Sequence, residues 1–279
     1  MKSTDLIVST LKQQADESKW QESYSFVRDC APPTDTLMLD GRGPPGATCG
    51  LIRSPFRPSD DSCTLPFPVA ANCYVVFALH HLATILKEAV GDQSRAEQAE
   101  QLATSVFNAV MQFGVIQTEG IFAYEVDGFG SLYFMDDANF PGLLGLPLIG
   151  WGSSAIFNKT RSAVLSRRNP YFFTGKVASG VGGPHDRPGW IWPMSIINQA
   201  FTSDDDQEII NCLQVLKSSA LVGSYSVPGQ GNGFMHESFW KDDFSKFSRP
   251  WFSWANSLFG SLIVKLSVER PHILQHLFN

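Results

Sequence analysis

The stretches PVAANCYVVFALHHLATILKEAV (residues 68–90) and SRAEQAEQLATSVFNAVMQF (residues 94–113) decide the fold class. In each, apolar residues return every three or four positions, which is the spacing of one face of an α-helix. Gly91-Asp92 lies between them and is a turn sequence. The sequence therefore predicts two helices joined as an antiparallel hairpin.

Helical patterns also occur on both sides of this hairpin. Residues 3–28 are partly periodic, Pro141 is expected to begin a short apolar helix that extends to about Trp151, and Ser203-Asp204 is a capping sequence. The other expected helices are 153–166, 191–201, 205–218 and 249–268. The predicted fold is mainly α, built from helical hairpins.

Three segments depart from the helical pattern. Residues 31–49 are rich in proline and glycine, which excludes regular structure. Residues 121–134 alternate around Asp127-Gly128, which predicts a short β-hairpin. The glycine-rich loop 175–189 has no Gly-Lys-Ser/Thr ending, so we do not expect it to bind a nucleotide.

Composition limits the partners. With 279 residues, 43% of them hydrophobic, the chain is expected to form a single domain over residues 1–279. A net charge of −6 without a basic stripe argues against nucleic acid. We expect no membrane segment in this chain, since it has no apolar run of about 18 residues, and Met1–Trp20 is no signal peptide. The sequence predicts neither localisation nor oligomeric state.

Acidic clusters among aromatic or small polar residues are the clearest functional feature. They are RPSDD (residues 57–61), MDDAN (135–139) and MHESF (235–239). Carboxyl groups beside aromatic rings suit the cleavage of sugars, because the acids handle protons at the glycosidic bond and the rings stack on apolar sugar faces.

Each cluster also has a purely structural interpretation. RPSDD could be a turn in which Ser59 or Asp60 caps the following helix. MDDAN could interact with a helix dipole, and within MHESF Glu237 could be a first-turn helix acid and His236 a buried imidazole. The five cysteines form no CxxC pair and MDDAN has no metal-ligand partner at a suitable spacing, so neither a metal nor a cofactor is expected.

Several blocks in a fixed order resemble glycoside hydrolase family 125. They are GLIRSPFRPSDD (50–61), MDDAN (135–139), NPY (169–171), GPH (183–185), IWPM (191–194), MHESF (235–239) and RPWFSWANSLF (249–259). The resemblance implies an (α/α)6 toroid and an inverting, metal-independent exo-α-1,6-mannosidase that removes terminal mannose from mannose-containing glycans.

The same resemblance implies roles for individual residues. Glu237 would be the general base, and Asp61 or Asp60 the general acid, with Asp61 favoured. The residues expected to hold the terminal mannose are Arg57, Asp136, Asp137, Asn139, His185, Trp192, His236 and Trp251.

The chain departs from the family pattern at one point. Family members carry a Trp-Leu-Arg-Asp block in a helical segment before the matched region, and this sequence has no such block. About eight to nine helices are expected, against the twelve of a complete (α/α)6 toroid, so the toroid is expected to be incomplete at the N-terminus. The alternative prediction is a catalytically inactive relative that binds glycans or is vestigial.

Overall fold

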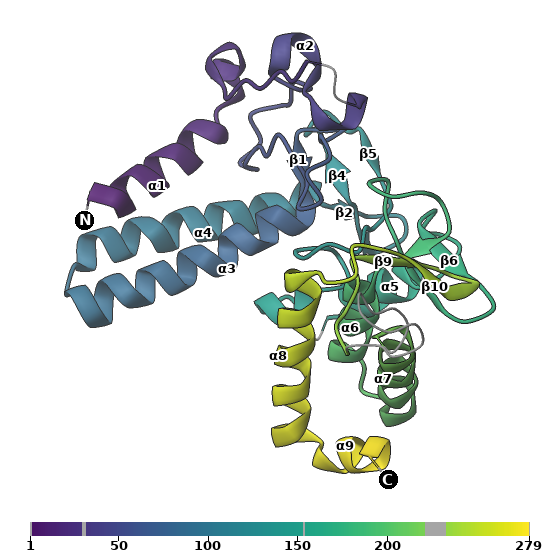
Figure 1. The fold of residues 1–279 in the computed structure, drawn as a ribbon. Coiled ribbons are helices and arrows are strands. Elements are labelled where there is room, and N and C mark those ends of the chain that lie inside the picture. The colour runs from purple at the N-terminus through teal and green to yellow at the C-terminus, as the bar shows by residue number, and fades with distance from the viewer. Residues whose placement is uncertain (1, 30–31, 153, 221–232, 279) are drawn as a thin grey trace. The chain divides into compact units, whose positions relative to one another are not determined.

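The structure is a computed structural model that describes residues 2–29, 32–152, 154–220 and 233–278. The chain divides into two compact units. The first contains Met1–Phe134 and Ile149–Thr160, and the second contains Met135–Leu148 and Arg161–Asn279. Figure 1 shows the mainly helical fold that the sequence predicts, and the two units are described separately below.

The predicted helical hairpin is confirmed in the first unit. Helix α3 (Val69–Ile85) continues as one π-helical turn (Leu86–Val90), and α4 (Gln93–Phe113) returns beside it (Figure 1). Gly91 has φ 76°, and Asp92 caps α4 by accepting a 3.1 Å hydrogen bond from the N–H of Arg95. Gly91 therefore has the left-handed conformation that glycine favours at the end of a helix, and Asp92 is an N-cap, a position that aspartate favours.

The hairpin buries one apolar stripe from each helix. In α4 most of the buried residues are alanines, such as Ala99 and Ala103, whose small side chains allow close approach. In α3 larger residues such as Val76 and Leu79 are buried. Burial of one such side chain stabilises the fold by about 1.5–3 kcal/mol.

By length and composition alone, Val69–Val90 could cross a membrane, with 44% of its apolar window buried inside the structure. The core helix of a soluble protein meets the same criterion.

The rest of the first unit consists of short helices and strands. Before the hairpin lie α1 (Lys2–Gln14), the 3₁₀ turns η1 (Glu17–Glu22) and η2 (Pro33–Asp35), and α2 (Met38–Gly41). The last two correct the expectation that residues 31–49 contain no regular structure, although each is only one short turn. Strands β1 (Phe67–Pro68), β4 (Glu125–Val126) and β5 (Leu132–Tyr133) form an antiparallel sheet, and β2 (Val115–Ile116) pairs with β3 (Ile121–Phe122). Helix α5 (Ala155–Val164) contains the boundary between the units.

The second unit combines helices with two sheets. Its helices are α6 (Pro193–Phe201), α7 (Asp206–Ala220), α8 (Ser253–Glu269) and α9 (Pro271–Phe278), and the 3₁₀ turn η4 (Leu146–Ile149) belongs to it up to Leu148. Strands β6 (Phe172–Thr174) and β7 (Ser179–Val181) pair, and β8 (Trp190–Ile191), β9 (Ser238–Trp240) and β10 (Asp243–Ser248) form a three-stranded sheet. Ile197, Leu216, Phe239 and Leu262 are fully buried in its core.

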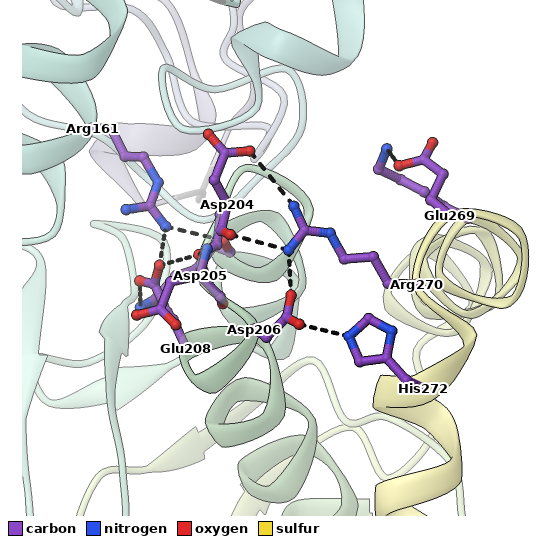
Figure 2. Close-up of polar contacts among 11 residues, drawn as sticks. Arg161, Asp204, Asp205, Asp206, Glu208, Glu269, Arg270 and His272 are labelled. Carbon is purple, nitrogen blue, oxygen red and sulfur yellow. Dashed lines mark hydrogen bonds and ion pairs between the residues drawn. The ribbon is translucent and has the colours of Figure 1, made fainter.

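Charged side chains tie the start of α9 to the start of α7 (Figure 2). The Arg270 guanidinium pairs with Asp206 and donates to the backbone oxygen of Asp204 at 3.0 Å, and His272 Nε2 lies 2.6 Å from Asp206 Oδ2. These hydrogen bonds hold the pKa of Asp206 below its ordinary value, His272 contributing most. Acids in the first helical turn are favoured by the helix dipole.

Some predicted boundaries are wrong. The expected helix over 3–28 ends at Gln14, because Asp16 caps a new turn by accepting from the N–H of Ser18 at 3.2 Å. No helix begins at Pro141, since glycines and Pro147 interrupt residues 142–147 and leave only η4. The expected helix over 249–268 starts at Ser253, after the Arg249-Pro250 pair.

The β-hairpin predicted near 121–134 is confirmed for its second half. Strands β4 and β5 pair around Asp127, whose Oδ1 accepts from the N–H groups of Phe129 and Ser131 at 2.8 and 2.9 Å. Its first half, β3, pairs with β2 instead, because a tight turn that ends at Gly120 (φ 67°) brings Ile121 opposite Ile116. The number of helical pairs in a toroid stays a prediction.

Candidate active site

The RPSDD segment forms a tight loop that distinguishes its two aspartates. The N–H of Arg57 donates to the backbone oxygen of Asp61 at 2.8 Å, and the N–H of Asp60 donates to the oxygen of Arg57 at 3.1 Å. Asp60 has φ 70° and is exposed, whereas Asp61 is 1% exposed and accepts from the Ser59 hydroxyl at 3.1 Å. The loop thus turns one carboxyl group to solvent and buries the other.

A buried ion pair anchors this loop to the sheet of the first unit. Arg57 Nε donates to Glu125 Oε1 at 2.6 Å, and Glu125 Oε2 accepts from the N–H groups of Thr64 and Leu65 at 2.8 and 2.9 Å. The Tyr133 hydroxyl donates to the same carboxylate at 2.5 Å. The sequence predicted that the Arg57 guanidinium contacts the sugar, but in the structure it connects the loop to Glu125 of the sheet.

The electrostatics of this cluster favour the charged form of Arg57. Burial opposes the charge of Arg57, but the hydrogen bond and the charge of Glu125 outweigh it, so the pKa of the guanidinium is raised. Burial, and then the charge of Glu125, raises the pKa of the Tyr133 phenol. Sequence reasoning missed Glu125, since nothing local pairs it with a residue 68 positions away.

In the second unit, MDDAN is held by its own first aspartate. Asp136 is 1% exposed, and its two oxygens accept from the N–H groups of Leu143 and Leu144 at 2.8 and 2.9 Å. Burial raises the pKa of this carboxyl group, and the charge of Asp137 adds to the effect. Asp136 therefore shapes the loop, while Asp137 and Asn139, both buried, lie beside it.

A side-chain amide secures the other edge of MDDAN. Asn169 Oδ1 accepts from the N–H of Asp136 at 3.2 Å, and Asn169 Nδ2 donates to the backbone oxygen of Asp136 at 3.1 Å. This arrangement explains why an asparagine in the NPY segment matters structurally, a role that the sequence alone did not indicate.

In MHESF, Glu237 is buried but reaches two hydrogen-bond donors. It is 7% exposed and lies just before β9. Its Oε2 accepts from the Ser248 hydroxyl at 3.1 Å, and its Oε1 lies 3.3 Å from Arg249 Nη1. Both contacts favour a carboxylate held in one orientation. Arg249 and Ser248 were not predicted as site residues.

The neighbouring His236 is fully buried. Its ring stacks on Phe247 at 3.9 Å between centroids, and its Nδ1 lies 3.1 Å from the backbone oxygen of Pro250. This environment positions the backbone on which Glu237 lies.

Aromatic rings connect the blocks of the second unit. The Trp192 ring meets His185 and Phe252 edge-on, with centroids 6.2 and 5.8 Å apart. Phe252 in turn donates its N–H to the backbone oxygen of Met235 at 3.0 Å. Trp192 is 2% exposed and its Nε1 is buried without a hydrogen-bond partner among the described residues, whereas Trp251 is 55% exposed.

The loop at Gly182-Gly183 joins MDDAN to the same region. Ala138 donates its N–H to the oxygen of Gly182 at 2.9 Å, and a Cβ placed on Gly183 would lie 3.2 Å from the Cβ of Asp137. The second unit thus brings together Asp137, His185, Trp192 and the segment that carries Glu237. Arg57, Asp60 and Asp61 belong to the first unit.

No ligand set for a metal is formed in the part of the chain that the structure describes, where three or more His, Cys, Asp or Glu side chains nowhere gather as a metal site requires. Among the described cysteines, Cys49, Cys73 and Cys212 are free thiols. An apolar hollow of about 400 Å³ lies on the α3–α4 hairpin, where Val76, Phe107 and Trp151 line it together with His80 and His81, and no carboxyl group does.

The fold and these segments define a mainly helical protein in which buried carboxyl groups and aromatic rings occur in the same segments, as in enzymes that act on sugars. The chain belongs to the family of metal-independent α-mannosidases, glycoside hydrolase family 125, whose model matches residues 1–264.

The chain is also similar to two known proteins. It is 43% identical to the meiotically up-regulated gene 157 protein of Schizosaccharomyces pombe, over 96% of this chain and 54% of that protein. A solved structure of a Streptococcus pneumoniae metal-independent α-mannosidase, in a non-productive complex with α-1,6-mannobiose, matches with a TM-score of 0.86 and 34% identity. That match covers 95% of this chain and 62% of the bacterial one. The chain therefore spans about half the length of the curated relative it matches.

Proposed function

We propose that this protein is an exo-acting glycoside hydrolase that removes terminal, non-reducing α-mannose from α-1,6 linkages with inversion of the anomeric centre. The family match over residues 1–264 is the observation that carries the proposal. The bacterial relative of known structure, solved with α-1,6-mannobiose, supports the choice of linkage. We also propose that residues 1–279 act as one glycoside hydrolase domain and that this domain works without a cofactor.

Glu237 is the general base in this proposal. An inverting enzyme needs a carboxylate that takes a proton from the attacking water. Glu237 is 7% exposed, and Ser248 and Arg249 both contact its carboxylate, which limits its rotation.

Asp61 is the general acid, and the loop geometry supports it over Asp60. A proton donor has to be held toward the leaving oxygen, and Asp61 is 1% exposed with its Oδ2 bonded to Ser59. Asp60 is exposed at the turn and less constrained. In inverting glycosidases generally, the acid and base carboxyl groups lie about 6.5–9.5 Å apart.

The remaining predicted residues divide by what their side chains touch. Asp137, Asn139, His185, Trp192 and Trp251 are proposed to contact the terminal mannose through hydrogen bonds and ring stacking. Arg57, Asp136 and His236 are proposed to act on the sugar through the loops that they hold, since each has buried partners of its own.

The test is hydrolysis of α-1,6-mannobiose followed by proton NMR. The expected first product is β-mannose, and Glu237→Gln is expected to lower kcat by roughly 10²–10⁴-fold while the unfolding midpoint stays unchanged. Glu269→Gln, an exposed glutamate on α8, serves as the matched control. Release of α-mannose would refute inversion, and full activity of Glu237→Gln would refute the base. A chain that binds mannobiose without cleaving it would be the glycan-binding relative instead.

A further inference from the structure

An unbroken line of hydrogen bonds runs from Glu237 to Asp186. Glu237 Oε2 accepts from the Ser248 hydroxyl at 3.1 Å. The Ser248 and Ser238 hydroxyl oxygens lie 2.7 Å apart, and the Ser238 hydroxyl donates to Asp186 Oδ2. Two carboxyl groups are thus connected through two hydroxyls.

The sheet of the second unit holds this line in place. Ser238 in β9 and Ser248 in β10 are direct partners in the antiparallel register, so their hydroxyls meet across the strands. Ser238 is fully buried. Asp186 comes from the loop between β7 and β8, where its Oδ1 accepts from the N–H of Arg187 at 2.8 Å, and it is partly exposed.

The number of protons along the line depends on the state of Glu237. A serine hydroxyl carries one proton and can donate only once. With Glu237 and Asp186 both ionised, two serine protons serve three oxygen–oxygen contacts, so one contact lacks a proton. When one proton is added on Glu237, each of the three contacts has a proton, provided that Glu237, Ser248 and Ser238 all donate in the direction of Asp186.

We propose that Ser248, Ser238 and Asp186 form a proton-transfer line that regenerates the base. This inference rests on the proposed function, because it starts from the proton that Glu237 takes from water. Glu237 passes that proton to Ser248 Oγ, Ser248 passes its own proton to Ser238 Oγ, and Ser238 passes its own to Asp186 Oδ2. Each hydroxyl gains and loses one proton, Glu237 ends ionised, and Asp186 releases the proton to solvent.

This line of hydrogen bonds gives a buried base a route by which it can lose its proton. Glu237 is 7% exposed, and its carboxylate must lose a proton in every turnover. A line of fixed hydroxyls that leads to a partly exposed carboxylate provides that route while substrate or product covers Glu237. Asp186 and the two serines are therefore positioning and proton-transfer residues that need not touch the sugar.

Asp186→Asn tests the line, because an asparagine can accept the Ser238 hydrogen bond but cannot take up the proton. We expect kcat for α-1,6-mannobiose to fall by roughly ten- to a hundredfold, less than the roughly 10²–10⁴-fold of direct acid–base catalysis, while KM stays unchanged. Ser248→Ala is expected to act similarly, and Ser248→Thr, which keeps the hydroxyl, to retain activity. Asp243→Asn is the matched control, since that carboxylate of β10 bonds only Ser245 and Lys246 among the described contacts.

Formate separates proton transfer from a merely structural role. In Asp186→Ala, added formate is expected to restore part of kcat, and it should leave the wild-type rate unchanged. Equal rates for Asp186→Asn and Asp243→Asn, or a loss in Asp186→Ala that formate does not relieve, would overturn the line. If Glu237→Gln is inactive while Asp186→Asn is fully active, the line alone is wrong. If the wild-type chain does not hydrolyse mannobiose, the proposed function fails and the line fails with it.

Discussion

The buried pair between Arg57 and Glu125 makes a sharp prediction about stability. Their side chains are 7% and 0% exposed, and Arg57 Nε lies 2.6 Å from Glu125 Oε1. Glu125→Gln keeps the shape of the side chain but removes its charge, which leaves a buried guanidinium without a counterion. Breaking a buried pair in this way costs about 3–5 kcal/mol.

Urea unfolding followed by far-ultraviolet circular dichroism measures this loss. With a urea m-value of about 3 kcal/mol per M, 3–5 kcal/mol corresponds to a midpoint lower by about 1–1.7 M. Glu269→Gln provides the control, because Glu269 pairs with Lys265 on the exposed side of α8 and such a pair contributes only about 0.3–0.5 kcal/mol.

A second substitution distinguishes lost pairing from lost packing. Arg57→Met in the Glu125→Gln background removes the unpaired charge, so the double variant is expected to be more stable than Glu125→Gln alone. The reasoning is refuted if Glu125→Gln costs less than about 1 kcal/mol, as an exposed pair would. It is equally refuted if the double variant loses stability additively.

Other predictions concern the two aspartates of RPSDD, the pH dependence of MDDAN and a tight glycine. In steady-state kinetics with α-1,6-mannobiose, Asp61→Asn should lower kcat by roughly 10²–10⁴-fold and Asp60→Asn by much less; the reverse order would exchange their roles. Burial raises the pKa of Asp136 above its ordinary value of 3.8, so this carboxyl group binds a proton more tightly in the folded chain than in the unfolded chain. Its contribution to the stability of the fold therefore falls as the pH rises from the unfolded pKa through the folded pKa. The stability of the wild type relative to Asp136→Asn should therefore decrease with pH above about 4, and urea titrations that show the opposite slope would contradict this. Gly182→Ala should destabilise the second unit or prevent its folding, since a Cβ there would lie 2.1 Å from the oxygen of Trp190; an unchanged thermal midpoint would contradict the placement.

The helical hairpin was predictable because its information is local. Apolar periodicity over 68–90 and 94–113 predicts the two helices, and Gly91-Asp92 between them predicts the turn. The wrong helix boundaries have local causes. Asp16 caps a new turn after α1, and α8 begins only at Ser253, after Pro250.

The candidate site was predictable only in part. The sequence pointed to RPSDD, MDDAN and MHESF as segments, but their side chains have different surroundings. Within RPSDD, Asp60 is exposed and Asp61 is buried, because the loop reverses at Asp60 with φ 70°. Within MDDAN, Asp136 caps backbone N–H groups that lie seven and eight residues further along.

By itself, the sequence determined that the chain is mainly helical, which segments carry its carboxyl groups and which family it resembles. These are properties of residue spacing and of short ordered motifs. Only the tertiary structure decided what each side chain contacts: Glu125 holds Arg57 from 68 residues away, and Asp186 reaches Ser238 across 52. Such partners depend on how distant strands and loops meet, and local propensity contains no information about that meeting. In the hairpin the decisive interactions are near neighbours in sequence, and in the site they are not.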